Sequence, residues 1–440
     1  MLGNGSLDDA LKKFQQKFKD KSGLRWEDRC EDPKPGKYAF VEKNYQEDSD
    51  EDMEPDGRDI QVVDDYEPPP CSLPEAVRGL MDLIFNRQFF AATMTALNYD
   101  ANKLPLGKLS KTTISRGFQA LKDLSALLDD PDLAGSLYNE ALPLAIQNLS
   151  NLYYSVIPHA FGRFRPPIIN GYALLKKEVE LLESLSDMKD AELLMKVEKA
   201  KQKPNVHPTD KLYQELGMKE MTTLDHGSTE FHELANYLFS SRGSTHSIEY
   251  EVEEIFRIER QDEKLRFDAS VVSGSTKNKR LLWHGSRVTN FAGILNQGLR
   301  IAPPEAPVSG YMFGKGIYLA DMSSKSANYC CSGAFGGTAL LLLCEADLGN
   351  PVQELINASY TAGDDAKAKG LFSTLGQGQI GPLAWKDAGC IHEDLTGVKM
   401  PDVAISPGPT GHPNAHLLYN EYIVYDVSQI RLRYLFRVRI

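Results

Sequence analysis

Apolar residues in the first half of the chain recur at the three- and four-residue spacing of amphipathic helices. The first of these stretches begins at Ser6, which forms a capping-box pattern with Asp9. Its apolar face consists of Leu7, Leu11, Phe14 and Phe18, and its opposite side carries Lys12, Lys13, Lys17, Lys19 and Lys21. Lysines along a helix usually form a solvated face, and we interpret them so here, in preference to phosphate binding or nuclear targeting.

A second and longer helical region follows from Ser72. Ser72 and Glu75 predict a capping box, and the apolar residues after it recur at helical spacing as Val77, Leu80, Met81, Ile84 and Phe85. Similar periodicity returns over residues 133–156 and 174–185, with breaks in the Pro-containing segments 105–107 and 158–167. This pattern predicts an all-helical bundle.

The second half of the chain changes to patterns typical of strands. Residues 248–259 alternate apolar and charged side chains, and residues 430–440 alternate apolar residues with arginines. Apolar runs predict further strands at 281–283, 317–319, 338–344 and 421–425. A helix capped by Thr289 or Asn290 and ended by Gly298 is predicted, whereas residues 357–416, rich in Gly, Asp and Pro, are predicted to be loops. We therefore expect an α+β domain here.

The composition, with a hydrophobic fraction of 42% and a charged fraction of 25%, is that of an ordinary globular protein. A length of 440 residues predicts two or three domains. The net charge of −12 is not typical of a nucleic-acid-binding protein, so any contact with DNA must be local. The acidic segment 47–65 and the prolines after it predict a flexible linker in preference to an interaction tail or a modification site.

Neither a membrane span nor a metal site is predicted. The apolar runs are too short to cross a bilayer, and the first residues lack the basic start and apolar core of a signal peptide, so we expect an intracellular protein. The six cysteines contain no Cys-x-x-Cys pair, which favours free thiols. His412 and His416 are four residues apart but flank Pro413 in a Gly- and Pro-rich segment, which argues against a metal site there.

The densest group of candidate binding residues lies between Leu281 and Tyr329. His284, Gly285 and Ser286 follow a predicted strand, and ligands often bind at the ends of strands. Taken singly, a histidine or tyrosine in such a setting has an ordinary structural explanation. Glu421 differs, because an unpaired carboxylate in an apolar strand is energetically costly.

Four motifs resemble the catalytic domain of poly(ADP-ribose) polymerases, and the likeness is strongest to the nuclear, DNA-damage-dependent members. They are His284-Gly285-Ser286, Gly314-Lys315-Gly316-Ile317-Tyr318, Ser326-Ala327-Asn328-Tyr329 and Leu418-Tyr419-Asn420-Glu421-Tyr422. The resemblance implies an all-α regulatory bundle over residues 71–204. It also implies an α+β ADP-ribosyltransferase domain with a mainly antiparallel split β-sheet over residues 209–440.

Residues 1–45 resemble the C-terminal remnant of a WGR domain, the DNA-sensing module of this family, and residues 46–70 would form the acidic and Pro-rich linker. None of Trp26, Trp283 and Trp385 is followed by Gly-Arg, so the tripeptide that names the module is absent. Whether this chain senses DNA breaks is therefore left open.

The resemblance also implies a site for NAD+ as co-substrate, without a metal. Gly285 would contact the nicotinamide carboxamide through its backbone, Ser286 would orient the loop, and Ser326 would donate its hydroxyl to the carboxamide. Tyr318 and Tyr329 would stack on the pyridinium ring. His284 would bind the adenine-side ribose, with Asn290 and Arg300 around the adenosine.

Glu421 would carry the chemistry, by holding a hydroxyl of the nicotinamide ribose and stabilising the positive charge that develops there. With His284 and Tyr318 it would complete the triad associated with polymer formation. Lys325, Met312 and Tyr419 would lie on the acceptor side.

The implied function is poly-ADP-ribosylation of proteins, including automodification, in the nucleus as part of the DNA damage response, with DNA breaks as a candidate partner. Three alternatives stay open: a mono-ADP-ribosyltransferase, an NAD glycohydrolase and an inactive NAD-binding scaffold protein at DNA breaks.

Overall fold

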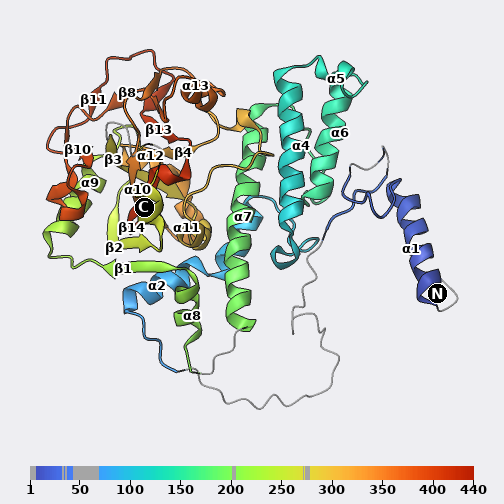
Figure 1. The fold of residues 1–440 in the computed structure, drawn as a ribbon, viewed down its shortest axis with the longest axis horizontal. Coiled ribbons are helices and arrows are strands. Elements are labelled where there is room, and N and C mark those ends of the chain that lie inside the picture. The colour runs from blue at the N-terminus through green and yellow to red at the C-terminus, as the bar shows by residue number, and fades with distance from the viewer. Residues whose placement is uncertain are drawn as a thin grey trace. The chain divides into compact units, whose positions relative to one another are not determined.

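The computed structural model describes residues 6–31, 34, 37–42, 69–200, 205–270, 272 and 278–440. Most of the predicted linker, residues 46–68, lies outside the described residues. The described part begins with helices and continues with mixed helices and strands (Figure 1). It divides into two compact units, the first formed by residues 1–56, 97–182 and 304–307 and the second by residues 57–96, 183–303 and 308–440. Within the described ranges, no helix is long and apolar enough to cross a membrane.

The described part of the first unit is helical. Helix α1 (Leu7–Ser22) begins at Ser6, whose side chain accepts a hydrogen bond from the Asp9 N–H, as the capping pattern predicts. The rings of Phe14 and Phe18 pack edge-on against Trp26, with centroid separations of 4.8 and 5.1 Å. The unit also contains η1 (Leu106–Lys108), α4 (Lys111–Asp129), α5 (Leu133–Ser136), α6 (Leu142–Val156) and the first part of α7 (Tyr172–Ala200). Helices α4 and α6 pack against each other.

The second unit contains the last part of α7 and begins with four further helices. These are α2 (Glu75–Ile84), α3 (Arg87–Ala96), α8 (Pro208–Glu215) and α9 (Thr229–Ser240). The predicted capping box of Ser72 and Glu75 is wrong, because Pro74 precedes α2 without a side-chain cap. The Ser72 hydroxyl and N–H instead donate to the Asp210 carboxylate of α8 at 2.8 and 2.9 Å. Hydrogen bonds to a carboxylate are strong, and these two hold Ser72 against α8 instead of at the start of α2.

The largest sheet has seven strands in the order β1-β2-β14-β5-β3-β10-β9. Their bounds are β1 Met218–Thr223, β2 Glu251–Arg260, β14 Ile430–Arg439, β5 Thr338–Asp347, β3 Lys279–Ser286, β10 Lys399–Pro401 and β9 Trp385–Asp387. All neighbours pair antiparallel except β10 and β3. Strand β5, which the apolar run predicts, is buried along nearly its whole length at the centre.

Two smaller sheets complete the strand-rich half of the chain. A four-stranded sheet has the order β4-β13-β7-β6, and a three-stranded sheet has the order β11-β8-β12. Their bounds are β4 Ile317–Leu319, β13 Glu421–Val424, β7 Ser373–Gly376, β6 Gln353–Leu355, β11 Gly408–Pro409, β8 Gly378–Gly381 and β12 Leu417–Tyr419. The sheet is therefore split, as expected, and the arrangement is mainly antiparallel.

The loop prediction for residues 357–416 is wrong. This segment contains β7, β8, β9, β10, β11 and the helix α13 (Ala362–Ala368). These strands are two to four residues long, too short to produce a readable alternation. Their glycines serve close packing: a Cβ on Gly378 would lie 2.4 Å from the carbonyl carbon of Tyr419.

Two neighbouring backbones join the large sheet to the four-stranded sheet. The Trp283 N–H donates to the Ala320 carbonyl at 2.8 Å, and the Ala320 N–H donates to the Trp283 carbonyl at 2.9 Å. Trp283 is fully buried in a core formed by α9, β3, β5 and β14.

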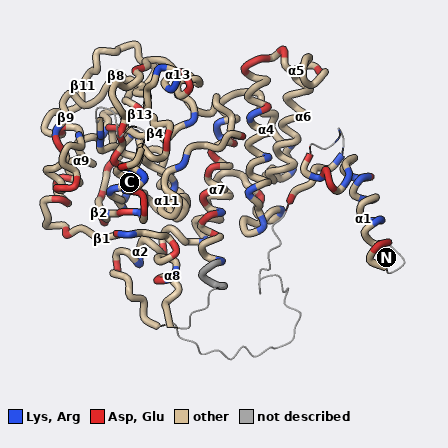
Figure 2. Tube along the Cα trace, in the orientation of Figure 1, with Lys and Arg blue, Asp and Glu red and all other residues tan. Residues whose placement is uncertain are grey.

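Charged residues of both signs occur along the strands at the β1 end of the large sheet (Figure 2). Glu259 of β2 accepts from Lys219 of β1 at 2.8 Å and pairs with Arg431 of β14 at 3.0 Å. Ion pairs between adjacent strands therefore support this edge, while apolar residues fill the centre.

Candidate functional site

The predicted binding residues converge where β3, β4 and β13 meet. His284, Gly285 and Ser286 are the last residues of β3, so they lie within the strand and not after it as expected. Tyr318 of β4 pairs with Ile423 of β13, which places Glu421 at the start of the adjacent strand. The His284 Nδ1–H donates to the Tyr318 carbonyl at 3.0 Å, because a carbonyl can only accept. Burial lowers the pKa of His284, which favours the neutral ring.

Gly285 lies against the backbone of the short helix α12 (Ser323–Ala327). A Cβ at this position would lie 2.0 Å from the Ser326 carbonyl oxygen, so only glycine fits. The buried Ser326 hydroxyl donates to the Trp283 carbonyl at 3.0 Å. The two residues expected to hold a carboxamide are therefore adjacent, and both are fixed to β3.

Ser286 and Asn290 support each other. The Asn290 side-chain amide donates to the Ser286 hydroxyl at 2.9 Å. Asn290 ends the short helix η2 (Val288–Asn290) and precedes α11 (Phe291–Gln297), but its side chain makes no capping bond to that helix. Gly298 ends α11 at φ +83°, as predicted.

The two tyrosines expected to stack on nicotinamide differ in exposure. The Tyr318 hydroxyl accepts from the Phe313 N–H at 2.9 Å and donates to the Gly314 carbonyl at 2.8 Å, which fixes the ring. Burial raises the pKa of Tyr318, so its hydroxyl stays protonated. Tyr329 follows α12 and is 51% exposed. One ring is thus a fixed wall, and the other is accessible to solvent.

Glu421 is paired and nearly buried, with an exposed fraction of 8%. One carboxylate oxygen lies 3.1 Å from the Lys325 Nζ, which also donates to the Tyr419 carbonyl at 2.7 Å. Burial lowers the pKa of Lys325, and the charge of Glu421 opposes that shift. Lys325 therefore connects Glu421 to Tyr419, two of the residues predicted around the acceptor.

Of the remaining predicted residues, Tyr419 and Met312 lie near this group. The Tyr419 hydroxyl bonds to the Thr245 N–H at 3.1 Å and to its hydroxyl at 2.8 Å. Met312 is partly buried and packs with Tyr318 against a small apolar cluster.

Arg300 is engaged elsewhere. Its guanidinium pairs with Asp190 of α7 at 2.6 Å and with Asp187 of the same helix. The guanidinium of Arg300 is therefore held against α7.

Asp321 is the residue that sequence reasoning missed. It is fully buried between β4 and α12, and its Oδ2 accepts from the Asn420 amide at 2.8 Å and from the Tyr422 hydroxyl at 3.0 Å. The signal was present, because an aspartate directly after the apolar run 317–320 is as unusual as Glu421 in its strand.

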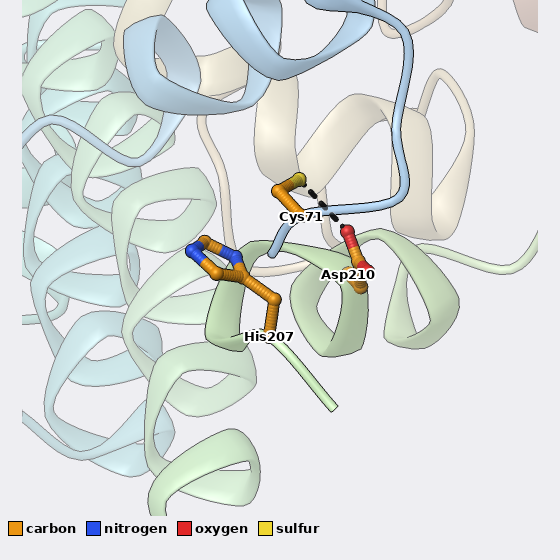
Figure 3. A group of neighbouring side chains, drawn as sticks. All are labelled: Cys71, His207 and Asp210. Atoms are coloured by element: carbon orange, nitrogen blue, oxygen red, sulfur yellow. Dashed lines mark hydrogen bonds between the residues drawn. The ribbon is translucent and has the colours of Figure 1, made fainter. Parts of the chain in front are cut away.

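One further cluster could suggest a metal. Cys71, His207 and Asp210 place one ligand atom each within 4.8 Å of one another (Figure 3). The Cys71 thiol donates to Asp210 at 2.9 Å, and the His207 Nδ1 accepts from the Thr209 N–H at 3.1 Å. Zinc ligands at about 2.0–2.3 Å from the ion lie about 3.3–3.8 Å apart in a tetrahedral site. The hydrogen bond between Cys71 and Asp210 joins the start of the helical region to α8.

Comparison with known proteins adds to this geometry. Residues 71–213 match the regulatory domain of poly(ADP-ribose) polymerase, and residues 228–440 match its catalytic domain. Poly [ADP-ribose] polymerase 2 of Arabidopsis thaliana is 39% identical over 439 residues, which cover 99% of this chain and 64% of the relative. Poly [ADP-ribose] polymerase 2 of Homo sapiens is 39% identical over 440 residues, which cover 99% and 70%. The chain thus spans less than two thirds of the A. thaliana relative.

These matches extend over both the helical and the strand-rich parts of the chain, and the catalytic match includes His284, Tyr318 and Glu421. The human relative is 39% identical to this chain, and the chain covers 70% of its length. The chain therefore belongs to the poly(ADP-ribose) polymerase family.

Proposed function

We propose that this chain transfers ADP-ribose from NAD+ to protein side chains and then elongates the attached chain. The observation that carries the proposal is the position of Glu421. Its buried carboxylate is held by Lys325 at the start of β13, one strand from Tyr318, whose carbonyl binds His284. Three residues from three different strands thus lie close together.

The donor half of the reaction would use the rigid part of the site. Gly285 would offer its backbone N–H and C=O to the carboxamide, and Ser326 would turn its hydroxyl from the Trp283 carbonyl to the carboxamide oxygen. Tyr318 would stack beneath the pyridinium ring, which contributes about 0.5–1.5 kcal/mol beyond burial. The His284 Nε2 would accept from the adenine-side ribose, because Nδ1 already donates to Tyr318.

Glu421 would act on the ribose next to nicotinamide. As the bond between C1′ and the nicotinamide nitrogen breaks, the electron pair leaves with nicotinamide and positive charge develops on the ribose. A fixed carboxylate stabilises that charge without reorganising at the moment of reaction. The acceptor oxygen then forms the new bond to C1′ and loses its proton. Glu421 would polarise that hydroxyl during elongation, with Lys325 and Tyr419 on the same side.

Family membership also supports a nuclear role in the DNA damage response, with proteins, including this chain itself, as acceptors. DNA breaks are the candidate activator, although the Trp-Gly-Arg tripeptide is absent from the sequence. NAD+ is the only small co-substrate that this proposal requires.

The test is incorporation of labelled NAD+ by the purified chain, with and without nicked DNA, resolved by product length. We expect long polymer from the wild-type chain and none from Glu421→Gln, which should still bind nicotinamide. Glu233→Gln is the control, because Glu233 also pairs with a lysine, Lys386, at 2.8 Å outside the site. Long polymer from Glu421→Gln would refute the role of this residue.

The same assay separates the alternatives. Protein carrying single ADP-ribose units would identify a mono-ADP-ribosyltransferase. Free ADP-ribose without protein labelling would identify a glycohydrolase. NAD+ binding without turnover, with and without DNA, would identify an inactive scaffold.

A further inference from the structure

A single buried carboxylate oxygen holds both neighbours of Glu421. Asn420 and Tyr422 flank Glu421, and successive side chains of an extended chain point to opposite faces. Both donate to the Oδ2 of Asp321, at 2.8 and 3.0 Å. Glu421, between them, meets Lys325 on the other side at 3.1 Å.

The segment that carries Asp321 contacts β13 from both faces. Asp321 lies two residues before α12, and Lys325 lies within α12, so one short stretch of chain provides the partner of Glu421 and the partner of its neighbours. That stretch is itself anchored, because Ala320 exchanges two backbone hydrogen bonds with Trp283 of β3. A shift of β13 relative to α12 would therefore break contacts on both faces at once.

The network extends beyond Asp321 on each side. The Tyr422 hydroxyl also accepts from the Arg280 Nη1 at 3.0 Å, and the Asn420 side-chain oxygen accepts from the Gly378 N–H at 2.8 Å. The guanidinium of Arg280 in turn lies 4.1 Å from the ring centroid of Trp385. Because Arg280 donates to the Tyr422 hydroxyl oxygen, the hydroxyl proton of Tyr422 is left to bind Asp321.

A buried carboxylate is costly, and apolar residues of similar volume often serve stability better. Asp321 is fully buried and forms no ion pair within the described residues. Among the described residues, its side chain forms hydrogen bonds with the side chains of the two residues beside Glu421. That selectivity favours a role in arranging the site over a general role in the core.

We propose that Asp321 is a positioning residue that fixes the direction of the Glu421 carboxylate by holding Asn420 and Tyr422. This inference rests on the function proposed above for Glu421. Asp321 itself is buried behind β13, so it acts through Glu421 and touches no substrate.

The test compares Asp321→Asn and Tyr422→Phe with the wild-type chain in three measurements: the elongation rate at saturating NAD+, the KM for NAD+ and the dissociation constant of nicotinamide. Asp321→Asn should lower the rate by about 10- to 100-fold, the range found when supporting residues of a site are changed. Tyr422→Phe removes only one of the two donors and should lower it less. KM and nicotinamide affinity should change by less than about 3-fold, because β3 and α12 keep their contacts.

Asp347→Asn is the matched control. Asp347 is 3% exposed and accepts from the Gly349 N–H at 3.2 Å, at the far end of β5. It should keep the wild-type elongation rate, even where its melting temperature falls. If Asp321→Asn does not fold, Tyr422→Phe carries the test, since it removes one hydroxyl and leaves the ring in place.

A double variant, in which Asp321→Asn is added to Glu421→Gln, distinguishes failure of this inference from failure of the proposed function. Residual nicotinamide release should fall by less than about 2-fold when Asp321→Asn is added to Glu421→Gln, because residues that act through one another are not additive. A full additional loss in that background would overturn the inference, as would a wild-type elongation rate in Asp321→Asn. Long polymer from Glu421→Gln alone would instead refute the proposed function, whatever Asp321→Asn does.

Discussion

Asp321 should make the folded protein less stable at neutral pH than at mildly acidic pH. Burial raises the pKa of Asp321 from 3.8 to about 6, against the opposing hydrogen bonds from Asn420 and Tyr422. The folded state therefore holds this proton more tightly than the unfolded state. The resulting stabilisation is complete below pH 4 and is lost as the pH rises through about 6. At 1.36 kcal/mol per unit, the shift corresponds to about 3 kcal/mol.

The variant Asp321→Asn removes this titration. Its free energy of unfolding relative to the wild-type chain should increase by up to about 3 kcal/mol between pH 4 and pH 7. Any change in hydrogen bonding adds a constant to this difference in unfolding free energy that does not depend on pH. The diagnostic quantity is therefore the change of the difference with pH. Burial also raises the pKa of Asp187 to about 6, but Asp187 titrates in both proteins and cancels in the difference.

Urea unfolding at several pH values measures this change. The tryptophans Trp283 and Trp385 belong to the same compact unit as Asp321, whereas Trp26 belongs to the other. A Trp26→Phe background therefore restricts the fluorescence signal to the relevant unit. A difference that stays constant from pH 4 to pH 7 would refute the argument, because it would mean that Asp321 ionises without a burial cost.

Three other predictions follow from single contacts. Gly285→Ala should abolish nicotinamide binding and lower the melting temperature, since its Cβ would lie 2.0 Å from the Ser326 carbonyl oxygen; Gly333→Ala, with no atom within 4 Å, should change neither. Calorimetry that finds normal nicotinamide affinity in Gly285→Ala would contradict the placement. His284→Ala should raise the Kd of NAD+ about 10-fold, the effect of about 1.4 kcal/mol for one lost hydrogen bond, and unchanged affinity would count against the ribose contact. Addition of Zn2+ should shift the melting temperatures of the wild-type chain and of Cys71→Ser equally, and a larger shift in the wild-type chain would reveal a metal site.

Long, regular patterns in the sequence predicted several of the long elements of the fold. The apolar run of β5 and the alternation of β14 correspond to the two long strands at the centre of the large sheet. The helix at Ser6 begins as predicted because its cap lies three residues from its partner. Such elements are long enough to be recognised from neighbouring residues, although β5 and β14 pair with each other from distant parts of the chain.

The failures have a different cause. Ser72 does not cap α2 because its N–H and hydroxyl are held by Asp210, 138 residues away. Strands such as β8 are too short to show a period. Their glycines allow close approach to other segments of the same chain, which the local sequence does not reveal. The pairing of Arg300 with Asp190 could not be predicted either, because it depends on a helix more than a hundred residues earlier.

The candidate site was read from motifs, and the motifs contain the residues that would touch NAD+. They do not identify the residues behind them. Asp321 was overlooked because its partners, Asn420 and Tyr422, lie about a hundred residues away, and no spacing rule connects them. The argument from burial cost that selected Glu421 would also have selected Asp321.

The reciprocal hydrogen bonds between Trp283 and Ala320 have a consequence for the way the catalytic half opens. Both residues are buried, and the bridge lies two residues from Gly285 and next to Asp321. Amide protons in such a place exchange with solvent only when the surrounding unit opens cooperatively. We therefore expect the Trp283 and Ala320 amides to be among the slowest to exchange, at a common rate. The two sheets would then separate together, so the lifetime of these two hydrogen bonds would set how often Tyr318 and His284 move apart.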